Sequence, residues 1–153
     1  GFELDNTLSE SGGVSRGIGT ADQTGFLTDV VEHHKIAMNE DGKIYGENNV
    51  TGETVELAPK ALCSMNMWGF TPDYFKYSEE YFTEFLDANK ENLKAEYFIP
   101  LMVNKLVNEN TASVKILDTT SKWFGVTYAA DRQSVVDKIQ ELVNAGEYPS
   151  KLF

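Results

Sequence analysis

The sequence predicts an α/β fold in which a mixed sheet, including a small antiparallel meander, is flanked by helices. The first observation is the stretch of residues 62–70, which is almost free of charge and mostly apolar, as expected for a central strand buried on both faces. The second is a change of period, because residues 1–60 read as short strands and turns, whereas apolar residues after Phe70 recur at helical spacing. The 153 residues are enough for one core, so we expect residues 1–153 to form a single domain.

In the first half, turn residues divide the chain into strands that follow one another as a meander. We expect strands over residues 14–20 and 26–36. A hairpin turn is expected over residues 39–42, where Asp-Gly occupies the turn. A second turn over residues 48–52 precedes a strand over residues 53–57.

In the second half we expect helices over residues 72–88, 95–108 and 131–145, and strands over residues 113–118 and 123–126. The tyrosines and phenylalanines that recur along the first helix indicate a core-facing stripe rather than a ligand box. Residues typical of helix boundaries support these limits: Thr71, Pro72, Pro100, Asp131 and Gly146.

Composition excludes several classes of partner. A formal net charge of −11 argues against a nucleic-acid surface. Cys63 is the single cysteine and lies in an apolar run, so a disulfide framework is excluded and a cytoplasmic location is expected. The sequence contains no apolar run of about 18 residues and no signal peptide, so we expect no membrane partner. The chain opens abruptly in a strand-like stretch, as expected of a domain cut from a longer protein.

Polar residues within apolar strands are the candidate site residues. Asn66 either pairs with neighbouring backbone or contacts a ligand. Glu32 is followed by two histidines, and neighbouring strand residues point to opposite faces, so His33 and His34 cannot easily share a metal. Glu32 and one histidine either face a substrate or form a solvated strand end.

A glycine motif over residues 13–19 matches the G-x-x-x-G-I-G loop of short-chain dehydrogenases. That loop should follow an apolar strand and open a helix, but here a polar stretch precedes it and turn residues follow. No tyrosine in the chain is followed by a lysine four residues later, so the catalytic pair of that family is absent. We therefore reject a dinucleotide site.

Several motifs, taken together, resemble the second half of a sugar-phosphate nucleotidyltransferase of the nucleoside-triphosphate transferase (GT-A-like) family. Residues 1–4 and 26–35 are similar to the passage from the family's "GY" strand to its "E-K" strand end. Residues 65–70 lie where the family has its "N-T-G-I-Y" strand, and residues 95–100 resemble its "G-E-Y-Y-L-T" helix start. Residues 123–127 lie where it reads "W-x-D-x-G-T" or "G-V-N". Residues 7–19 and 62–100 also resemble one bacterial group of these enzymes.

The resemblance implies a partial GT-A or Rossmann-like fold and a defined reaction. A sugar phosphate, or a similar phosphate monoester, attacks the α-phosphorus of a nucleoside triphosphate and pyrophosphate leaves, with Mg²⁺ neutralising charge. Glu32 would accept hydrogen bonds from acceptor hydroxyls, and Lys35 or His33 would meet its phosphate. Asn66 would contact the sugar or support the strand.

Two departures from the family bear on activity. Its nucleotide loop and first metal-binding aspartate belong to an N-terminal portion that these residues do not include, so this chain alone is expected to be inactive. The second metal position falls at residues 125–127, where Thr127 is a poor substitute for a carboxylate and Asp131 could compensate. The alternative is a non-catalytic module of the same fold that binds sugar phosphates or regulates a partner.

Overall fold

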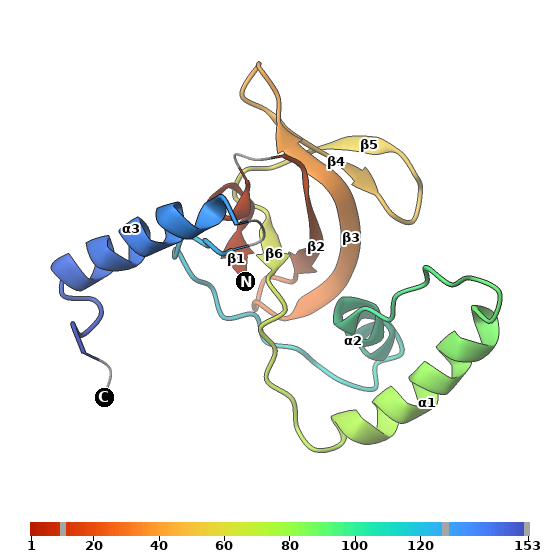
Figure 1. Ribbon diagram of the computed structural model, residues 1–153. Helices are drawn as coiled ribbons and strands as arrows, with labels where there is room; N and C mark the ends of the chain where they lie inside the picture. Colours follow the sequence, from red (N-terminus) through yellow and green to blue (C-terminus); the bar gives the residue numbers. More distant parts are fainter. Residues whose placement is uncertain (10–11, 127–128, 152–153) are drawn as a thin grey trace. The chain divides into compact units, whose positions relative to one another are not determined.

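The computed structural model describes residues 1–9, 12–126 and 129–151, and within them two compact units. The first unit is Gly1–Ser121 and the second is Lys122–Phe153. The first unit contains an antiparallel sheet of six strands in the order β1-β6-β2-β3-β4-β5 (Figure 1). The strands are β1 (Phe2–Glu3), β2 (Val14–Ala21), β3 (Leu27–Met38), β4 (Ile44–Asn48), β5 (Thr54–Leu57) and β6 (Leu62–Ser64).

The predicted meander is confirmed, because β2, β3, β4 and β5 pair in sequence order. The turn between β3 and β4 closes with the Asn39 N–H donating to the Lys43 carbonyl at 2.8 Å. Gly42 has a φ of 78°, a left-handed conformation that glycine adopts without strain. The glycines of residues 13–19 lie in and beside β2, so the rejected dinucleotide loop is indeed a strand.

The predicted strand over residues 62–70 is correct only for residues 62–64 and wrong after them. β6 ends at Ser64, and Asn66 adopts a left-handed φ of 55°, which directs the chain out of the sheet. Met67 is 85% exposed, so the apolar run is not buried on both faces. The prediction failed because hydrophobicity does not reveal which segment finds a strand partner.

The strands predicted over residues 113–118 and 123–126 are also absent from the described structure. The first of these segments is tied to the sheet by isolated contacts: a bridge between Phe26 and Lys115, and an N–H of Leu27 that donates to the Val114 carbonyl at 2.8 Å. Since all the strand pairs of the six-stranded sheet are antiparallel, the expectation of a mixed sheet is wrong, while the α/β class is confirmed.

The three predicted helices are present: α1 (Tyr74–Ala88), α2 (Ile99–Asn108) and, in the second unit, α3 (Asp131–Asn144). Pro100 lies in the first turn of α2, as expected. The residues at the N-cap positions of α1 and α3 are Asp73 and Ala130, so the predicted caps Thr71 and Asp131 are wrong. A short 3-10 helix, η1 (Leu4–Thr7), follows β1.

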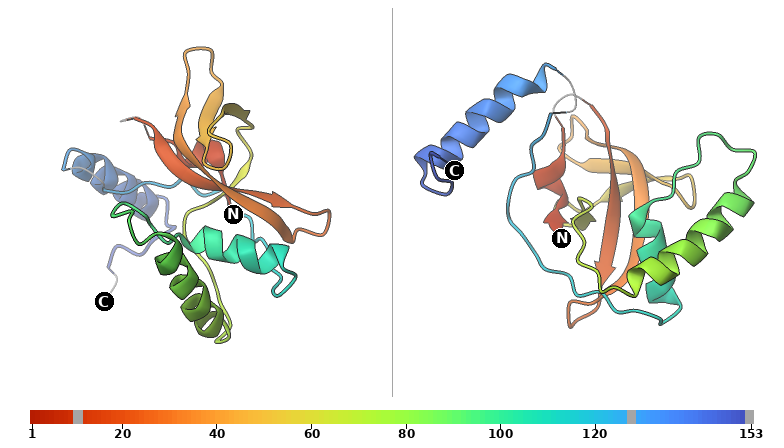
Figure 2. Two further views of the ribbon diagram at one scale, coloured as in Figure 1. Left: turned by 90° about the vertical axis from the view of Figure 1, so that its right-hand side faces the viewer. Right: turned by 60° about the horizontal axis from the view of Figure 1, so that its bottom comes forward.

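α2 lies against one face of the sheet (Figure 2). The N–H of Val30 on β3 donates to the Asn104 Oδ1 atom at 2.9 Å, and Val103 packs with Leu27 and Val30. A second cluster on α1 and α2 contains Tyr81, Met102 and Leu106. The other face of the sheet buries a third cluster: Leu4, Ile36, Ile44, Leu57 and Cys63.

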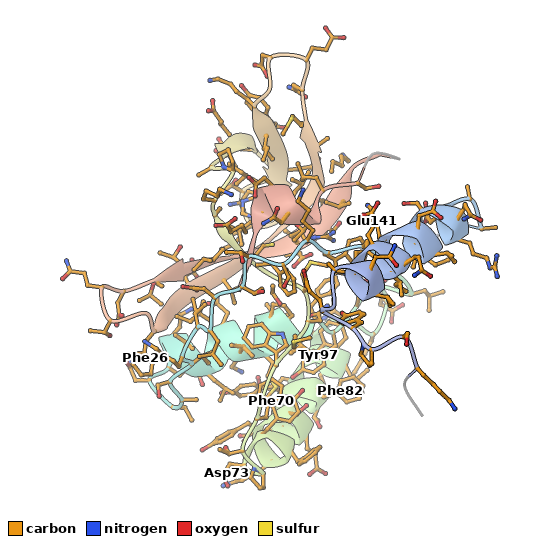
Figure 3. The ribbon with its side chains drawn as sticks, turned by 90° about the vertical axis from the view of Figure 1, so that its left-hand side faces the viewer. Phe26, Phe70, Asp73, Phe82, Tyr97 and Glu141 are labelled. Atoms are coloured by element: carbon orange, nitrogen blue, oxygen red, sulfur yellow. The ribbon has the colours of Figure 1, made fainter. Side chains whose placement is uncertain are left out.

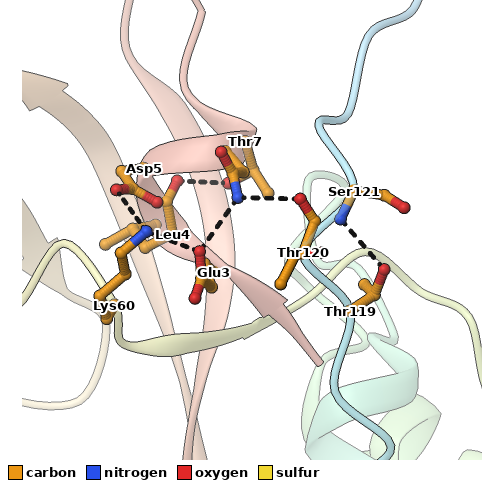
Figure 4. Close-up of polar contacts among 9 residues, drawn as sticks. Glu3, Leu4, Asp5, Thr7, Lys60, Thr119, Thr120 and Ser121 are labelled. Atoms are coloured by element: carbon orange, nitrogen blue, oxygen red, sulfur yellow. Dashed lines mark hydrogen bonds and ion pairs between the residues drawn. The ribbon is translucent and has the colours of Figure 1, made fainter.

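A polar network ties the start of the chain to residues 119–121 (Figure 4). Lys60 Nζ lies 2.6 Å from Glu3 Oε2 and 3.2 Å from Asp5 Oδ2. The amide of Asn6 donates to Glu3 Oε2 at 3.1 Å and to the Thr120 carbonyl at 3.4 Å. These contacts hold β1 and η1 in place beside β6.

The second unit contains one amphipathic helix whose side chains are not fully buried. Gly146 follows α3 with a φ of 78°, and its N–H donates to the Val143 carbonyl at 3.0 Å. The predicted glycine end of this helix is therefore confirmed. Among the described residues of both units, no helix is both long and apolar enough to cross a membrane.

Candidate ligand-binding site

The candidate site is built on a row of three residues across the centre of the sheet. Gly17 on β2 pairs with Glu32 on β3 and with Ser64 on β6. Directly paired residues project to the same face, so the serine hydroxyl and the glutamate carboxylate flank a position without a side chain. In the next row on this face, Gly19 lies between Val30 and Leu62. The floor of the site is thus polar in one row and apolar in the next.

Glu32 places a carboxylate without hydrogen-bond donors from the described residues on this face of the sheet. Its Oε2 atom lies 3.4 Å from the point that a β-carbon of Gly17 would occupy, and Pro100 of α2 lies 3.5 Å from the same point. In the described part of the chain, no group donates a hydrogen bond to this half-buried carboxylate. Burial raises the pKa of the Glu32 carboxyl, and the nearby charges of His34 and Arg16 lower it by less.

His34 is the second ionisable group on this face, because it lies two residues after Glu32 on the same strand. Its Nδ1 atom lies 2.9 Å from Ser15 Oγ, and its Nε2 atom lies 3.3 Å from Asn49 Oδ1. A single neutral tautomer satisfies both contacts, with Nε2–H donating to Asn49 and Nδ1 accepting from the serine hydroxyl. The N–H of Asn49 also donates to the Glu32 carbonyl at 3.0 Å.

The predicted phosphate residues lie elsewhere. His33 is buried on the opposite face, where its Nδ1 atom lies 2.9 Å from the Val31 carbonyl oxygen. Lys35 has a left-handed φ of 53° within a β-bulge, and its ammonium group lies 2.6 Å from Glu47 Oε2 on β4. The structure therefore does not bring His33 to the carboxylate, and it pairs Lys35 with another acid.

Asn66 is exposed and lies past the end of β6, so the prediction of a buried amide within a strand is wrong. Its N–H donates to Ser64 Oγ at 3.1 Å. Asn66 and Glu32 do not follow one another across the sheet either, because β2 lies between β6 and β3. Sequence reasoning did not select Ser64. It left open which histidine shares a face with Glu32, and the two-residue alternation of the strand places His34 there.

Of the two predicted metal residues, the structure describes only Asp131. Thr127 lies outside the described residues, and Asp131 is the first residue of α3 in the second unit. The described ranges contain no group of three or more His, Cys, Asp or Glu side chains placed to hold a metal ion. One carboxylate does not make a Mg²⁺ site without further oxygen ligands, so this donor set does not fit the ion by itself.

A cavity of about 1170 Å³ opens over the two glycine rows within the first unit. Gly17, Gly19 and Ser64 line its floor, and Val103 and Leu106 of α2 line one side. Aromatic rings form another wall: Phe70 stacks on Tyr74 with ring centroids 4.0 Å apart, and on Trp68 at 6.2 Å. In Figure 3, Asp73 marks the beginning of α1 and Phe70 lies above it. The indole N–H of Trp68 is buried without a hydrogen-bond partner.

Comparison with known proteins identifies no family. No protein-family model and no curated protein matches this chain.

Proposed function

We propose that this chain is the acceptor-binding part of a nucleotidyltransferase, which transfers a nucleotidyl group from a nucleoside triphosphate to a sugar phosphate or similar phosphate monoester. The observation that supports this most is the half-buried Glu32 carboxylate, which receives no hydrogen bond from the described residues. A buried charge without donors is costly. Hydroxyl groups of a bound acceptor would supply those donors.

In this proposal, the site binds and orients the acceptor. Glu32 accepts hydrogen bonds from its hydroxyls, and the Ser64 hydroxyl lies across Gly17 in the same row. The aromatic wall that contains Trp68 and Phe70 suits the apolar face of a sugar ring. Holding the acceptor in one orientation is a large part of the catalytic effect in reactions of this kind.

The nucleotide and Mg²⁺ would be bound mainly by a portion outside these 153 residues. The ion would neutralise phosphate charge when bound. The GT-A-like form of the fold is part of the proposal, although an antiparallel six-stranded sheet fits such a fold poorly. Support therefore comes from the site and from the order of the motifs.

The second candidate is a non-catalytic module that binds sugar phosphates. It is favoured by the described donor set, which does not hold Mg²⁺ by itself. Nucleotidyl transfer by the full-length parent protein distinguishes the two candidates, since a binding module would bind the acceptor without releasing pyrophosphate.

Replacing Glu32 by Ala in the full-length parent tests the acceptor site. We expect the affinity for sugar phosphates to fall by about ten- to a hundredfold, because hydrogen bonds to a charged carboxylate contribute roughly 1.5–3 kcal/mol to binding. The matched control is Glu53→Ala, since Glu53 is an exposed residue of the β4–β5 turn. Unchanged affinity in the Glu32 variant, with an intact fold, would remove this residue from the site.

A further inference from the structure

The structure leaves one question about the proposed site, namely which group receives the acceptor's phosphate. Of the two residues expected for this role, His33 is buried on the opposite face and Lys35 is ion-paired with Glu47. Arg16 is also unsuitable, because its side chain projects to the opposite face and donates to the Thr7 carbonyl at 2.6 Å.

We infer that His34 binds the phosphate of the acceptor while Glu32 binds a hydroxyl group of the same molecule. This inference rests on the proposed function. The two residues are alternate residues of β3 on one face, and the ring of His34 is held between Ser15 on β2 and Asn49 after β4. The Nε2 contact to Asn49 is long, at 3.3 Å, and Asn49 is exposed, so a phosphate oxygen can replace it.

The spacing of the two groups defines the class of ligand. Alternate residues of a strand lie roughly 6–7 Å apart, which matches the separation between a phosphate and a hydroxyl group on a small polyol or sugar. Inorganic phosphate lacks the hydroxyl, and a free sugar lacks the phosphate, so each would use half of the site. The site therefore selects a hydroxylated phosphate monoester.

A protonated imidazole binds phosphate more strongly than a neutral one, because it adds a charge to the hydrogen bond, so affinity should be higher at a pH where the ring of His34 is protonated. The charged groups around this ring are Glu32 on its own strand, Glu47 on β4, which is paired with Lys35, and Arg16 across the sheet.

The test is calorimetric titration of the full-length parent with glucose 1-phosphate at pH 6 and pH 8, with His34 followed by NMR in parallel. We expect affinity to be about tenfold higher at pH 6 and His34→Gln to remove this difference. Lys35→Gln should keep the difference, as should the control Lys43→Gln, because Lys43 is an exposed partner of Glu56. The NMR resonances of the His34 ring should move when the ligand is bound.

The results separate this inference from the proposed function. A pH dependence that survives in His34→Gln, or that disappears in Lys35→Gln, overturns the assignment to His34 even if Glu32 still binds the acceptor. Inorganic phosphate that shifts the His34 ring resonances as strongly as glucose 1-phosphate, with no effect of Glu32→Gln, supports the anion site but contradicts the hydroxylated ligand and the proposed acceptor role. Absence of any shift with either ligand overturns the inference.

Discussion

The Oε2 atom of Glu32 lies over the main chain of Gly17, 3.4 Å from the point that a β-carbon at position 17 would occupy. The same β-carbon would lie 3.2 Å from Val30 Cγ2, which is closer than an ordinary contact. The glycine therefore allows the carboxylate to lean over β2, and Gly17 itself lines the floor of the cavity. The missing side chain at Gly17 on β2 thus decides where the Glu32 carboxylate of β3 can lie.

We predict that Gly17→Ala destabilises the chain by about 1–2 kcal/mol, because the added methyl group must displace Val30 or the Glu32 carboxylate. Urea denaturation would measure the change. Gly69→Ala is the control, since no atom lies within 4 Å of its β-carbon position. Equal stability of the two variants would show that the strands adjust without cost. Under the proposed function, Gly17→Ala should also weaken the binding of sugar phosphates.

We predict that Glu32→Gln stabilises the folded chain at pH 7. Burial raises the pKa of the Glu32 carboxyl above its ordinary value of 4.5, so the folded state holds this proton more tightly than the unfolded chain. The contribution to stability is therefore greatest below pH 4.5 and is lost as the pH rises through the folded pKa. Glutamine does not ionise, so the Glu32→Gln variant does not lose this stability at high pH. The difference in the free energy of unfolding between the variant and the wild type should therefore become smaller from pH 7 to pH 4.

Urea denaturation of both proteins at pH 4, 5.5 and 7 checks this prediction, with Glu53→Gln as the exposed control. A wild-type chain that is more stable than Glu32→Gln at pH 7 would mean that the carboxylate is structural. Stabilisation by removal of a charge, combined with weaker acceptor binding, is the pattern expected of a functional residue.

We predict that Tyr81→Phe destabilises the chain by about 1–2 kcal/mol. The hydroxyl of Tyr81 on α1 donates to Glu109 Oε2 at 2.5 Å, and Lys105 Nζ lies 3.7 Å from the centre of its ring. The control is Tyr148→Phe, which alters an exposed ring in the second unit. Thermal denaturation would measure both, and equal melting temperatures would contradict a structural role for this hydrogen bond.

We also predict that Tyr81 makes the folded chain less stable at alkaline pH. Burial, followed by the hydrogen bond to Glu109, raises the pKa of the Tyr81 hydroxyl. The folded state keeps this proton when the unfolded chain loses it, so stability should fall as the pH rises above about 10. Tyr81→Phe should show a smaller fall, measured by denaturation at pH 9 and pH 10.5.

The sequence by itself determined those features that depend on neighbouring residues. The Asp-Gly turn at Gly42 set the hairpin between β3 and β4, because a left-handed backbone position there favours glycine. Helical spacing of apolar residues placed α1, α2 and α3 to within a few residues of their observed limits. Gly146 marked the end of α3 for the same local reason as Gly42.

Only the tertiary structure decided which apolar segments joined the sheet and which polar side chains met. Residues 65–70 are as apolar as a buried strand, but the left-handed Asn66 and the lack of a strand partner turn them into a cavity wall. The row of Ser64, Gly17 and Glu32 joins the consecutive strands β2 and β3 to β6, which is distant from both in sequence. The position of β6 in the sheet depends on pairing between such distant segments, and the hydrophobic pattern along the chain does not show which segments pair.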